Sequence, residues 1–272
     1  MNGRDMKRTL REGGTVCGTL IVSPSPKWLK YVGQIGLDFV FIDTEHVMID
    51  SLTLSWMCMA YAAAGLAPIV RIPSADPARA TQVLDGGAQG IVVPYMESPE
   101  VLRQMAGAVH LKPVKGQKLQ RELHGQAPFP GGLRDSLQEA NRNNMLFVNI
   151  ESVDAAENLD ALLDVPGLDG IVIGPNDLSY SMDMPNSYQD PAFRQAVASI
   201  LRRARARGVA AGVHALGPIE DQIAWARETG MNMLFHSGDV YAFVTGMKRD
   251  MDSFRKAVSA KASASGAVSI EI

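Results

Sequence analysis

Polar residues that can do acid–base and metal chemistry stand at the ends of four short apolar runs of the chain. They are Asp43, Glu45 and His46 at the end of residues 37–43, Arg71 at the end of residues 67–72, Glu151 after residues 145–150, and Gly174, Pro175, Asn176 and Asp177 at the end of residues 170–174. A single charged residue often follows an apolar run by chance. Acids, an imidazole and a guanidinium after four such runs indicate one site that the runs bring together.

Glu151 and Asp177 are the candidate metal ligands. Each directly follows an apolar run, so each is expected at the end of a buried strand. Two carboxylates that leave other coordination positions open suit Mg²⁺ or Mn²⁺, with Co²⁺ as a further candidate, better than Zn²⁺. The alternative, two unrelated surface acids, fits poorly with positions next to buried strands.

Arg71, His46 and Asp43 are candidates for work on the substrate. The planar guanidinium of Arg71 can bind a carboxylate or an enolate oxygen through two N–H groups, although a structural ion pair is the alternative role. His46 is a candidate base, and Asp43 could fix its tautomer and raise its basicity. A lone histidine is more often structural. The backbone N–H groups of residues 174–177 could bind a substrate carboxylate.

The elements that must position these residues are eight apolar runs that alternate with longer segments of helical period. The runs are residues 16–22, 37–43, 67–72, 90–95, 145–150, 170–174, 210–215 and 231–236. Each run is continuous rather than alternating, as in strands buried on both faces. Residues 191–208 illustrate the helical segments, with apolar residues on one stripe and arginines opposite. The pattern predicts an α/β fold, a single (β/α)8 TIM barrel.

Four glycines mark the expected ends of helices. Gly36, Gly65, Gly208 and Gly230 each stand just after a helical segment and just before an apolar run. Glycine is favoured there because a helix commonly ends on a residue in the left-handed conformation. These positions support the same alternation of helix and strand.

The chain is expected to form one domain over residues 1–272, because no linker or shift in composition divides it. Two segments depart from the alternation. Residues 112–132 combine proline, glycine and basic side chains, which predicts a long surface loop and a candidate lid. The tail at residues 262–272 is rich in small residues and would be ordered only if a neighbouring subunit packs on it.

Composition excludes some classes of function. The net charge is −3 and the basic residues are scattered, so no nucleic acid partner is expected. No apolar segment is long enough to cross a membrane, and the N-terminus lacks the apolar stretch of a signal peptide. Two cysteines without metal-ligand spacing, Cys17 and Cys58, suit a reducing compartment. We therefore expect a cytoplasmic protein.

Taken in order, six short motifs resemble the HpcH/HpaI family of class II pyruvate aldolases over about residues 5–255. They are residues 36–46, Val70-Arg71-Ile72-Pro73, Leu84-Asp85-Gly86-Gly87-Ala88, Val93-Pro94, Ile150-Glu151 and residues 174–179. The resemblance implies a barrel of the phosphoenolpyruvate/pyruvate superfamily type. It also implies self-association as hexamers, commonly trimers of dimers.

The resemblance implies roles residue by residue. Glu151 and Asp177 match the two metal ligands, and Arg71 matches the arginine on the keto oxygen. His46 and Asp43 match a catalytic dyad. Asp85 matches an acid donated from a neighbouring subunit.

Two departures from the family pattern concern the substrate site. The family usually has Gln two residues before the metal-binding Glu, whereas this chain has the shorter Asn149. Asn149 is expected to join Gly174, Pro175 and Asn176 in binding substrate. The usual Gly-Arg-Arg-like element after the fourth strand is replaced by residues 115–118, Lys-Gly-Gln-Lys. The basic side chains of residues 112–132 could attract an anionic tail of the substrate.

The expected reaction is the reversible, metal-dependent cleavage of a 4-hydroxy-2-oxo acid to pyruvate and an aldehyde. The ion and Arg71 would stabilise the enolate, and His46 would take the proton from the C4 hydroxyl. No lysine ends an apolar run at the expected site, which argues against a Schiff-base aldolase.

Other functions stay open. A lyase of the citrate-lyase β-chain or malyl-CoA lyase type would share the two-carboxylate metal site, but no basic nucleotide pocket is evident. Oxaloacetate decarboxylation would use the same enolate chemistry. A barrel that has lost catalysis and serves as a scaffold would be expected to lack some of Glu151, Asp177, Arg71 and His46, and all four are present.

Overall fold

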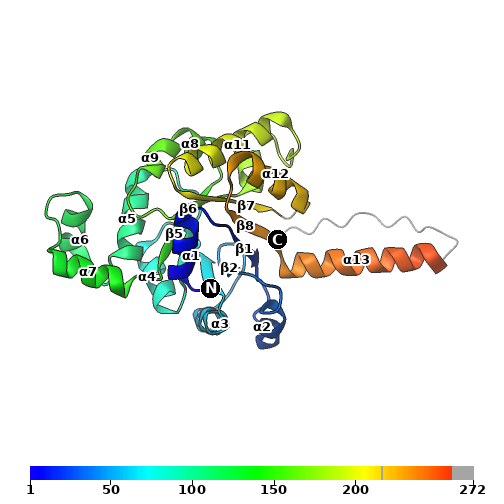
Figure 1. The fold of residues 1–272 in the computed structure, drawn as a ribbon, viewed down its shortest axis with the longest axis horizontal. Coiled ribbons are helices and arrows are strands. Elements are labelled where there is room, and N and C mark those ends of the chain that lie inside the picture. Colours follow the sequence, from blue (N-terminus) through cyan, green and yellow to red (C-terminus); the bar gives the residue numbers. More distant parts are fainter. Residues whose placement is uncertain (216, 259–272) are drawn as a thin grey trace.

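The strands form one closed parallel barrel in which each strand pairs with the next and the eighth pairs with the first. The computed structural model describes residues 1–215 and 217–258. Its strands are β1 (Val16–Leu20), β2 (Phe39–Asp43), β3 (Ala67–Arg71), β4 (Gly90–Val93), β5 (Met145–Ile150), β6 (Gly170–Ile173), β7 (Ala210–Ala215) and β8 (Met233–Gly238). The predicted (β/α)8 barrel is confirmed (Figure 1).

Most of the helices surround the barrel and connect its strands, whereas α1 precedes the first strand and α13 follows the last (Figure 1). They are α1 (Gly3–Arg11), α2 (Pro26–Val32), α3 (Ser51–Ala63), α4 (Pro77–Asp85), α5 (Pro99–His110), α6 (Gly116–Leu123), α7 (Gly131–Ala140), α8 (Val153–Glu157), α9 (Leu159–Leu163), α10 (Pro175–Ser181), α11 (Pro191–Ala206), α12 (Ile219–Thr229) and α13 (Asp239–Val258). We call the end of the barrel where the strands finish the mouth, and the opposite end the base.

Continuous apolar runs become strands because both faces are covered. Every residue of β2 to β6 is buried. One hydrophobic cluster, which includes Phe39, Phe147 and Phe235, fills the barrel, and a second lies between strands and helices. The helix α1 adds Met6 and Leu10 to the interior cluster and closes the base.

The boundaries of β8 differ from the prediction. This strand runs to Gly238, two residues beyond the predicted end, because its pairing with β1 continues to Leu20 opposite Gly238. Ser237 and Gly238 are small and carry no apolar signal. The register of the neighbouring strand, rather than hydrophobicity, extends β8.

The four glycines expected at helix ends all have a positive φ. The values are +83° for Gly36, +79° for Gly65, +73° for Gly208 and +74° for Gly230. The predicted cap role is confirmed for Gly65, Gly208 and Gly230, since side-chain-bearing residues seldom adopt this region. Gly36 instead lies three residues after the C-cap of α2, which is Gly33.

The prediction of a long surface loop over residues 112–132 is wrong. The segment contains α6 and the first residues of α7. Its helical signal was weak because α6 is short and Leu119 is its only buried residue. A methyl group at Gly107 of α5 would lie 3.0 Å from the Leu123 side chain, so α6 packs closely on α5.

The same segment does not begin at the mouth. The helix α5 ends at the base, where His110 Nε2 is 2.8 Å from the carbonyl oxygen of Gly167, three residues before β6. Asn141, the residue after α7, donates from Nδ2 to the carbonyl oxygen of Lys112 over 2.8 Å and so ties the end of α7 to the start of the segment. A segment anchored at the base is not placed to act as a lid on its own barrel.

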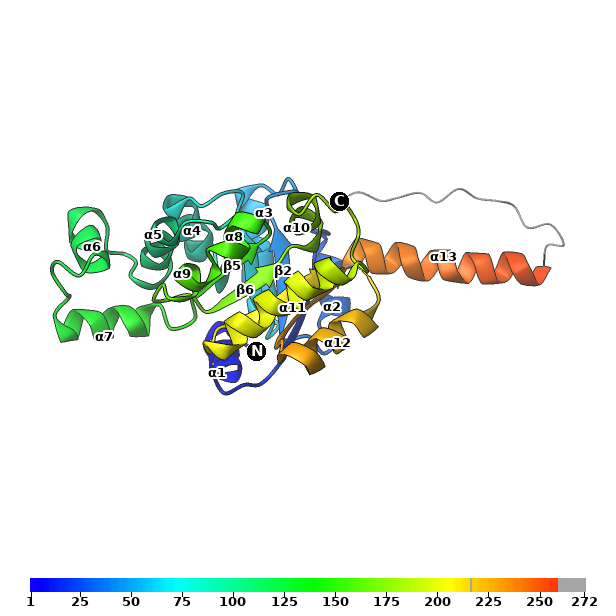
Figure 2. The ribbon, with the colours of Figure 1, turned by 90° about the horizontal axis from the view of Figure 1, so that it is seen from above.

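The last described helix extends away from the barrel in both views (Figures 1 and 2). It exposes a stripe of apolar residues at spacings of three and four, namely Val240, Phe243, Met247, Met251, Phe254 and Val258. No helix within residues 1–215 and 217–258 has the length and apolarity needed to cross a membrane. The tail predicted at residues 262–272 lies outside the described residues.

We predict that Gly208→Ala destabilises the protein by about 1 kcal/mol, because alanine in the left-handed conformation is strained. No atom of the described residues lies within 4 Å of a methyl group placed there, so any loss of stability comes from the backbone conformation. Thermal unfolding should show a loss of roughly 2–4 °C. The control is Gly132→Ala, whose methyl group also meets nothing and whose φ is not positive. Equal melting temperatures for the two variants would contradict the prediction.

Candidate active site

The predicted site residues meet at the mouth, with one exception. Asp43 and Arg71 are the last residues of β2 and β3, which pair in register. Glu151 follows β5, and residues 174–177 lead from β6 into α10. Asp85 instead ends α4 just before β4, at the base.

Two carboxylates hold the guanidinium of Arg71. Its Nε donates to Asp43 Oδ1 over 2.9 Å, and its Nη2 donates to Asp43 Oδ2 over 2.6 Å. Its Nη1 lies 3.1 Å from Glu45 Oε2, although the angle is not that of a hydrogen bond. Burial tends to raise the pKa of Asp43, but the hydrogen bonds and charge of Arg71 outweigh it and lower that pKa. Asp43 is therefore ionised and fixes the plane of the guanidinium.

Glu45 is the carboxylate beside His46. His46 Nε2 lies 3.6 Å from Glu45 Oε2, whereas Asp43 makes no ion pair with His46 within 4.0 Å. Burial raises the pKa of Glu45, and its Oε2 has no hydrogen-bond donor. The side chain of His46 is 47% exposed, so its imidazole is open to the mouth. Glu45 thus lies between Arg71 and His46.

Glu151 is a buried carboxylate with few partners. It is 1% exposed; its Oε1 accepts from the backbone N–H of Tyr95 over 2.8 Å, and its Oε2 accepts from Asn149 Nδ2 over 3.0 Å. Burial raises the pKa of Glu151 to about 7, and the charge of Asp177 adds to the rise. The other atom of the Asn149 amide, Oδ1, is buried and has no donor.

Asp177 lies in the first turn of α10 and is partly buried. Its charge acts on Glu151, Glu45 and Tyr95, so it belongs to the same cluster. Among residues 1–215 and 217–258, no group of three or more His, Cys, Asp or Glu side chains has a geometry ready for a metal. The metal site on the two carboxylates of Glu151 and Asp177 thus stays a prediction from the sequence.

The residues fit such an ion. A methyl group added to Gly174 would lie 2.4 Å from Glu151 Oε2. Glycine at this position therefore leaves space for the Glu151 carboxylate. The unpaired Oδ1 of Asn149 is a further oxygen of the kind that Mg²⁺ and Mn²⁺ accept, directly or through water.

Asp85 pairs with Lys112 at the base. Lys112 Nζ donates to Asp85 Oδ1 over 2.6 Å, and the Asp85 side chain is still 67% exposed. Asp85 is therefore outside the mouth of its own barrel but accessible to a neighbouring molecule.

The sequence reasoning missed three contributors to the mouth. Glu45 was named at the end of its apolar run but was given no role, and Tyr95 supplies a backbone donor at a positive φ of +46°. His214, in β7, places Nε2 3.2 Å from the carbonyl oxygen of Ser237 and packs its ring edge against Phe41, 5.4 Å between centroids. Burial lowers the pKa of His214 to about 4, so it is neutral. Its place at the end of an apolar run was the available signal.

Comparison with known proteins places this geometry in a family. The family model for HpcH/HpaI aldolase/citrate lyase matches residues 18–232. A 2-keto-3-deoxy-L-rhamnonate aldolase of Salmonella gallinarum is 32% identical over 255 residues, which are 93% of this chain and 94% of the relative.

Solved structures agree. An HpcH/HpaI aldolase from Desulfitobacterium hafniense DCB-2 superimposes with a TM-score of 0.79 at 27% identity, covering 92% of this chain and 96% of that one. The citrate synthase SbnG also gives 0.79, at 28% identity, covering 93% and 98%. The expected enzyme class, a carbon–carbon lyase of the aldolase type, is confirmed. The chain belongs to the HpcH/HpaI aldolase/citrate lyase family.

Proposed function

We propose that this enzyme uses a divalent metal ion to cleave 4-hydroxy-2-oxo acids reversibly to pyruvate and an aldehyde. One observation carries the proposal. The mouth gathers the carboxylates of Asp43, Glu45, Glu151 and Asp177, and the ion pairs of the described residues offer these four acids only Arg71 and His46 as cationic partners. Such an excess of negative charge calls for a bound cation.

Glu151 and Asp177 would hold the ion, since Arg71 already engages Asp43 and Glu45. Mg²⁺ and Mn²⁺ are the best candidates, because the donors are oxygens and several positions stay open. When bound, the ion supplies Lewis-acid stabilisation of the negative charge that develops on a 2-oxo acid.

Arg71 binds the pyruvyl unit. Two of its nitrogens face Asp43, and the outward N–H groups of the guanidinium remain for the keto oxygen. Because the contacts to Asp43 fix the guanidinium plane before substrate arrives, the enolate oxygen meets donors that need no rearrangement.

His46 takes the proton from the C4 hydroxyl as the C3–C4 bond breaks. Neutral imidazole accepts it, and the nearby Glu45 carboxylate stabilises the imidazolium that forms. Asp43, which the sequence assigned to this task, instead supports Arg71 through two hydrogen bonds. Asn149, Gly174, Pro175 and Asn176 line the side on which the substrate carboxylate would lie.

The name of a relative supports a class of substrate. A relative named for 2-keto-3-deoxy-L-rhamnonate suggests 2-keto-3-deoxy sugar acids, which contain the 4-hydroxy-2-oxo acid unit. The test is a panel of these and other 4-hydroxy-2-oxo acids, with pyruvate release followed in the presence of Mg²⁺, Mn²⁺ or Co²⁺. Oxaloacetate belongs in the panel, because decarboxylation passes through the same enolate. Release of pyruvate from oxaloacetate alone would contradict the aldolase proposal.

We also propose that the enzyme is a homo-oligomer, with a hexamer as the expected form, and that it acts in the cytoplasm. The exposed apolar stripe of α13 supports association, because a projecting helix with such a stripe needs a partner in water. Both cysteines are free, as a reducing compartment requires.

We predict that metal binding releases protons. In the metal-free protein the pKa of Glu151 is about 7, and an ion binds only the carboxylate. Affinity for Mn²⁺ should therefore be constant well above pH 7 and fall about tenfold per pH unit below it. Isothermal titration calorimetry in buffers of different ionisation enthalpy measures both effects. An affinity independent of pH from 5.5 to 8, or full activity after exhaustive chelation, would contradict a site at Glu151.

We predict that Gly174→Ala weakens Mn²⁺ binding by at least about tenfold, because the new methyl group would lie 2.4 Å from Glu151 Oε2 and displace it. The control is Gly217→Ala, which has nothing within 4 Å. Circular dichroism should show both variants folded. Unchanged Mn²⁺ affinity in a folded Gly174→Ala protein would show that Glu151 is not a ligand.

We predict that Arg71→Lys lowers kcat/KM by about a hundredfold or more while the barrel stays folded. Lysine keeps the charge but not the two-pronged contact with Asp43, so it cannot present fixed donors to the enolate. Steady-state kinetics and thermal unfolding separate the two effects. Near-normal turnover would assign Arg71 a structural role.

We predict that Asp85 completes the site of a neighbouring subunit. Mixing inactive Asp85→Asn chains with inactive His46→Ala chains should restore part of the activity, because some interfaces then hold one intact pair. Mixed oligomers are verified by native mass spectrometry. The absence of any recovery in such oligomers would sink the shared site.

A further inference from the structure

Asp177 is held differently from Glu151, the other proposed metal ligand. The carboxylate of Glu151 accepts hydrogen bonds from Tyr95 and Asn149. The hydrogen bonds and ion pairs among the described residues include none to the carboxylate of Asp177. A carboxylate without contacts of its own takes its position from its backbone. The direction of the Asp177 carboxylate therefore depends on how firmly the first turn of α10 is held.

The loop after α10 folds back on that turn and closes a ring of hydrogen bonds with it. The buried Ser179 donates from Oγ to the carbonyl oxygen of Asn176 over 2.7 Å and accepts from the backbone N–H of Asn186 over 3.1 Å. The Tyr188 hydroxyl lies 2.8 Å from Asn186 Oδ1 and 3.3 Å from Asn176 Oδ1. The ring therefore includes the residue directly before Asp177.

The backbone of the loop is shaped for this return. Asp183 and Asn186 have positive φ values of +55° and +58°. Asp and Asn tolerate the left-handed conformation better than most residues with a side chain. The backbone N–H of Met184 donates to the carbonyl oxygen of Ser179 over 2.8 Å. Two tight turns thus bring the loop to the start of α10 within a few residues.

Tyr188 presents its hydroxyl from a fixed place. Its ring packs edge-on against Phe193 of α11, 5.8 Å between centroids, and against the hydrophobic cluster between strands and helices. Burial raises the pKa of Tyr188, and the neighbouring Tyr180 and the charge of Asp177 add to the rise. The hydroxyl therefore keeps its proton and remains a hydrogen-bond donor close to Asp177.

We propose that Tyr188 is a positioning residue for the metal site, because its hydroxyl ties the loop after α10 to Asn176 and so fixes the direction of the Asp177 carboxylate. The inference rests on the proposed function, in which Glu151 and Asp177 hold the ion. Tyr188 touches neither ion nor substrate and acts only through Asn176. Residues that support a metal ligand in this way commonly change metal affinity by about tenfold to a hundredfold when they are replaced.

The first experiment removes the hydroxyl. Tyr188→Phe keeps the ring on Phe193 and should raise the dissociation constant for Mn²⁺ about tenfold in isothermal titration calorimetry. Thermal unfolding of the metal-free protein is measured alongside. A purely structural role would lower the melting temperature of the metal-free protein and leave the Mn²⁺ affinity of the folded protein unchanged.

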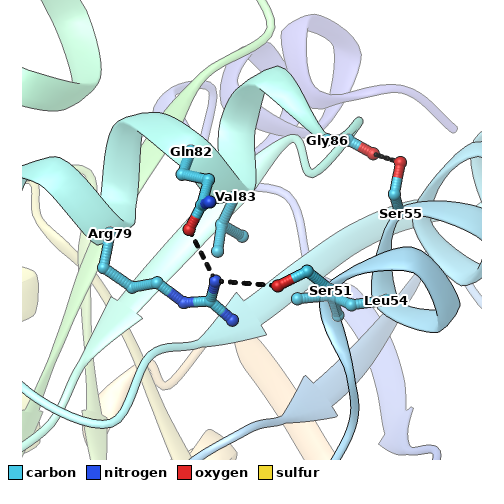
Figure 3. Close-up of a pocket in the computed structure, with 7 residues that line it drawn as sticks. All are labelled: Ser51, Leu54, Ser55, Arg79, Gln82, Val83 and Gly86. Atoms are coloured by element: carbon cyan, nitrogen blue, oxygen red, sulfur yellow. Dashed lines mark hydrogen bonds between the residues drawn. The ribbon is translucent and has the colours of Figure 1, made fainter.

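Two controls separate this effect from the loss of any surface hydrogen bond. Tyr180→Phe removes a hydroxyl from an exposed phenol on α10 itself. Ser51→Ala breaks the 3.4 Å contact with Arg79 Nη1 between α3 and α4 (Figure 3), which follow β2 and β3 across the barrel from β6. Both variants should bind Mn²⁺ as the wild type does.

The second experiment tests the ring as a unit. Asn186→Gly removes Oδ1, keeps the backbone N–H and suits the positive φ. Because both changes break one ring, the double variant with Tyr188→Phe should bind Mn²⁺ about as well as the weaker single variant. Unchanged affinity in folded Tyr188→Phe, an equal loss in Tyr180→Phe, or fully additive losses would overturn the proposal.

Failure of the proposed function gives a different result. A wild type that binds Mn²⁺ and loses affinity with Tyr188→Phe, but releases no pyruvate from any 4-hydroxy-2-oxo acid, would contradict the aldolase and support the positioning role. These affinities are measured without substrate. A wild type that binds no Mn²⁺ would overturn both.

Discussion

Burial of Glu151 is the constraint on which the rest of the mouth depends. A carboxylate with 1% of its surface exposed stays charged only if cations or donors replace its lost water. Two N–H donors reach it, and the nearest guanidinium, that of Arg71, is already engaged by Asp43 and Glu45. Glu151 is thus left with a raised pKa, and a bound cation is what would return that carboxylate to its charged state.

The barrel creates this situation by its topology. Parallel strands in register bring the ends of β2, β3, β5 and β6 to one rim, although these segments lie far apart in the chain. The register of β2 with β3 sets Asp43 beside Arg71, and the glycine after β6 leaves space for Glu151. Asp43, Arg71 and Glu151 are buried from water, so their charges act strongly on one another. The residues at these strand ends therefore serve both the packing of the barrel and the chemistry of the site.

The sequence predicted the barrel well because its strands are buried on both faces. Such strands appear in the sequence as continuous apolar runs, which can be recognised directly. It also placed Asp43, Arg71, Glu151 and Asp177 at strand ends. It failed over residues 112–132, because the helix α6 is only 8 residues long and buries only Leu119. The sequence did not predict that Glu45, rather than Asp43, lies beside His46. That placement depends on the two hydrogen bonds by which Arg71 engages both carboxylate oxygens of Asp43.

The central claim is that Glu151 and Asp177 hold a divalent ion beside Arg71. The most direct measurement is an anomalous difference map from crystals grown with Mn²⁺ and oxalate, a stable mimic of the pyruvate enolate. The account predicts one strong peak bridging the Glu151 and Asp177 carboxylates, with an oxalate oxygen in contact with Arg71. A peak elsewhere, or none at full Mn²⁺ saturation, would contradict it.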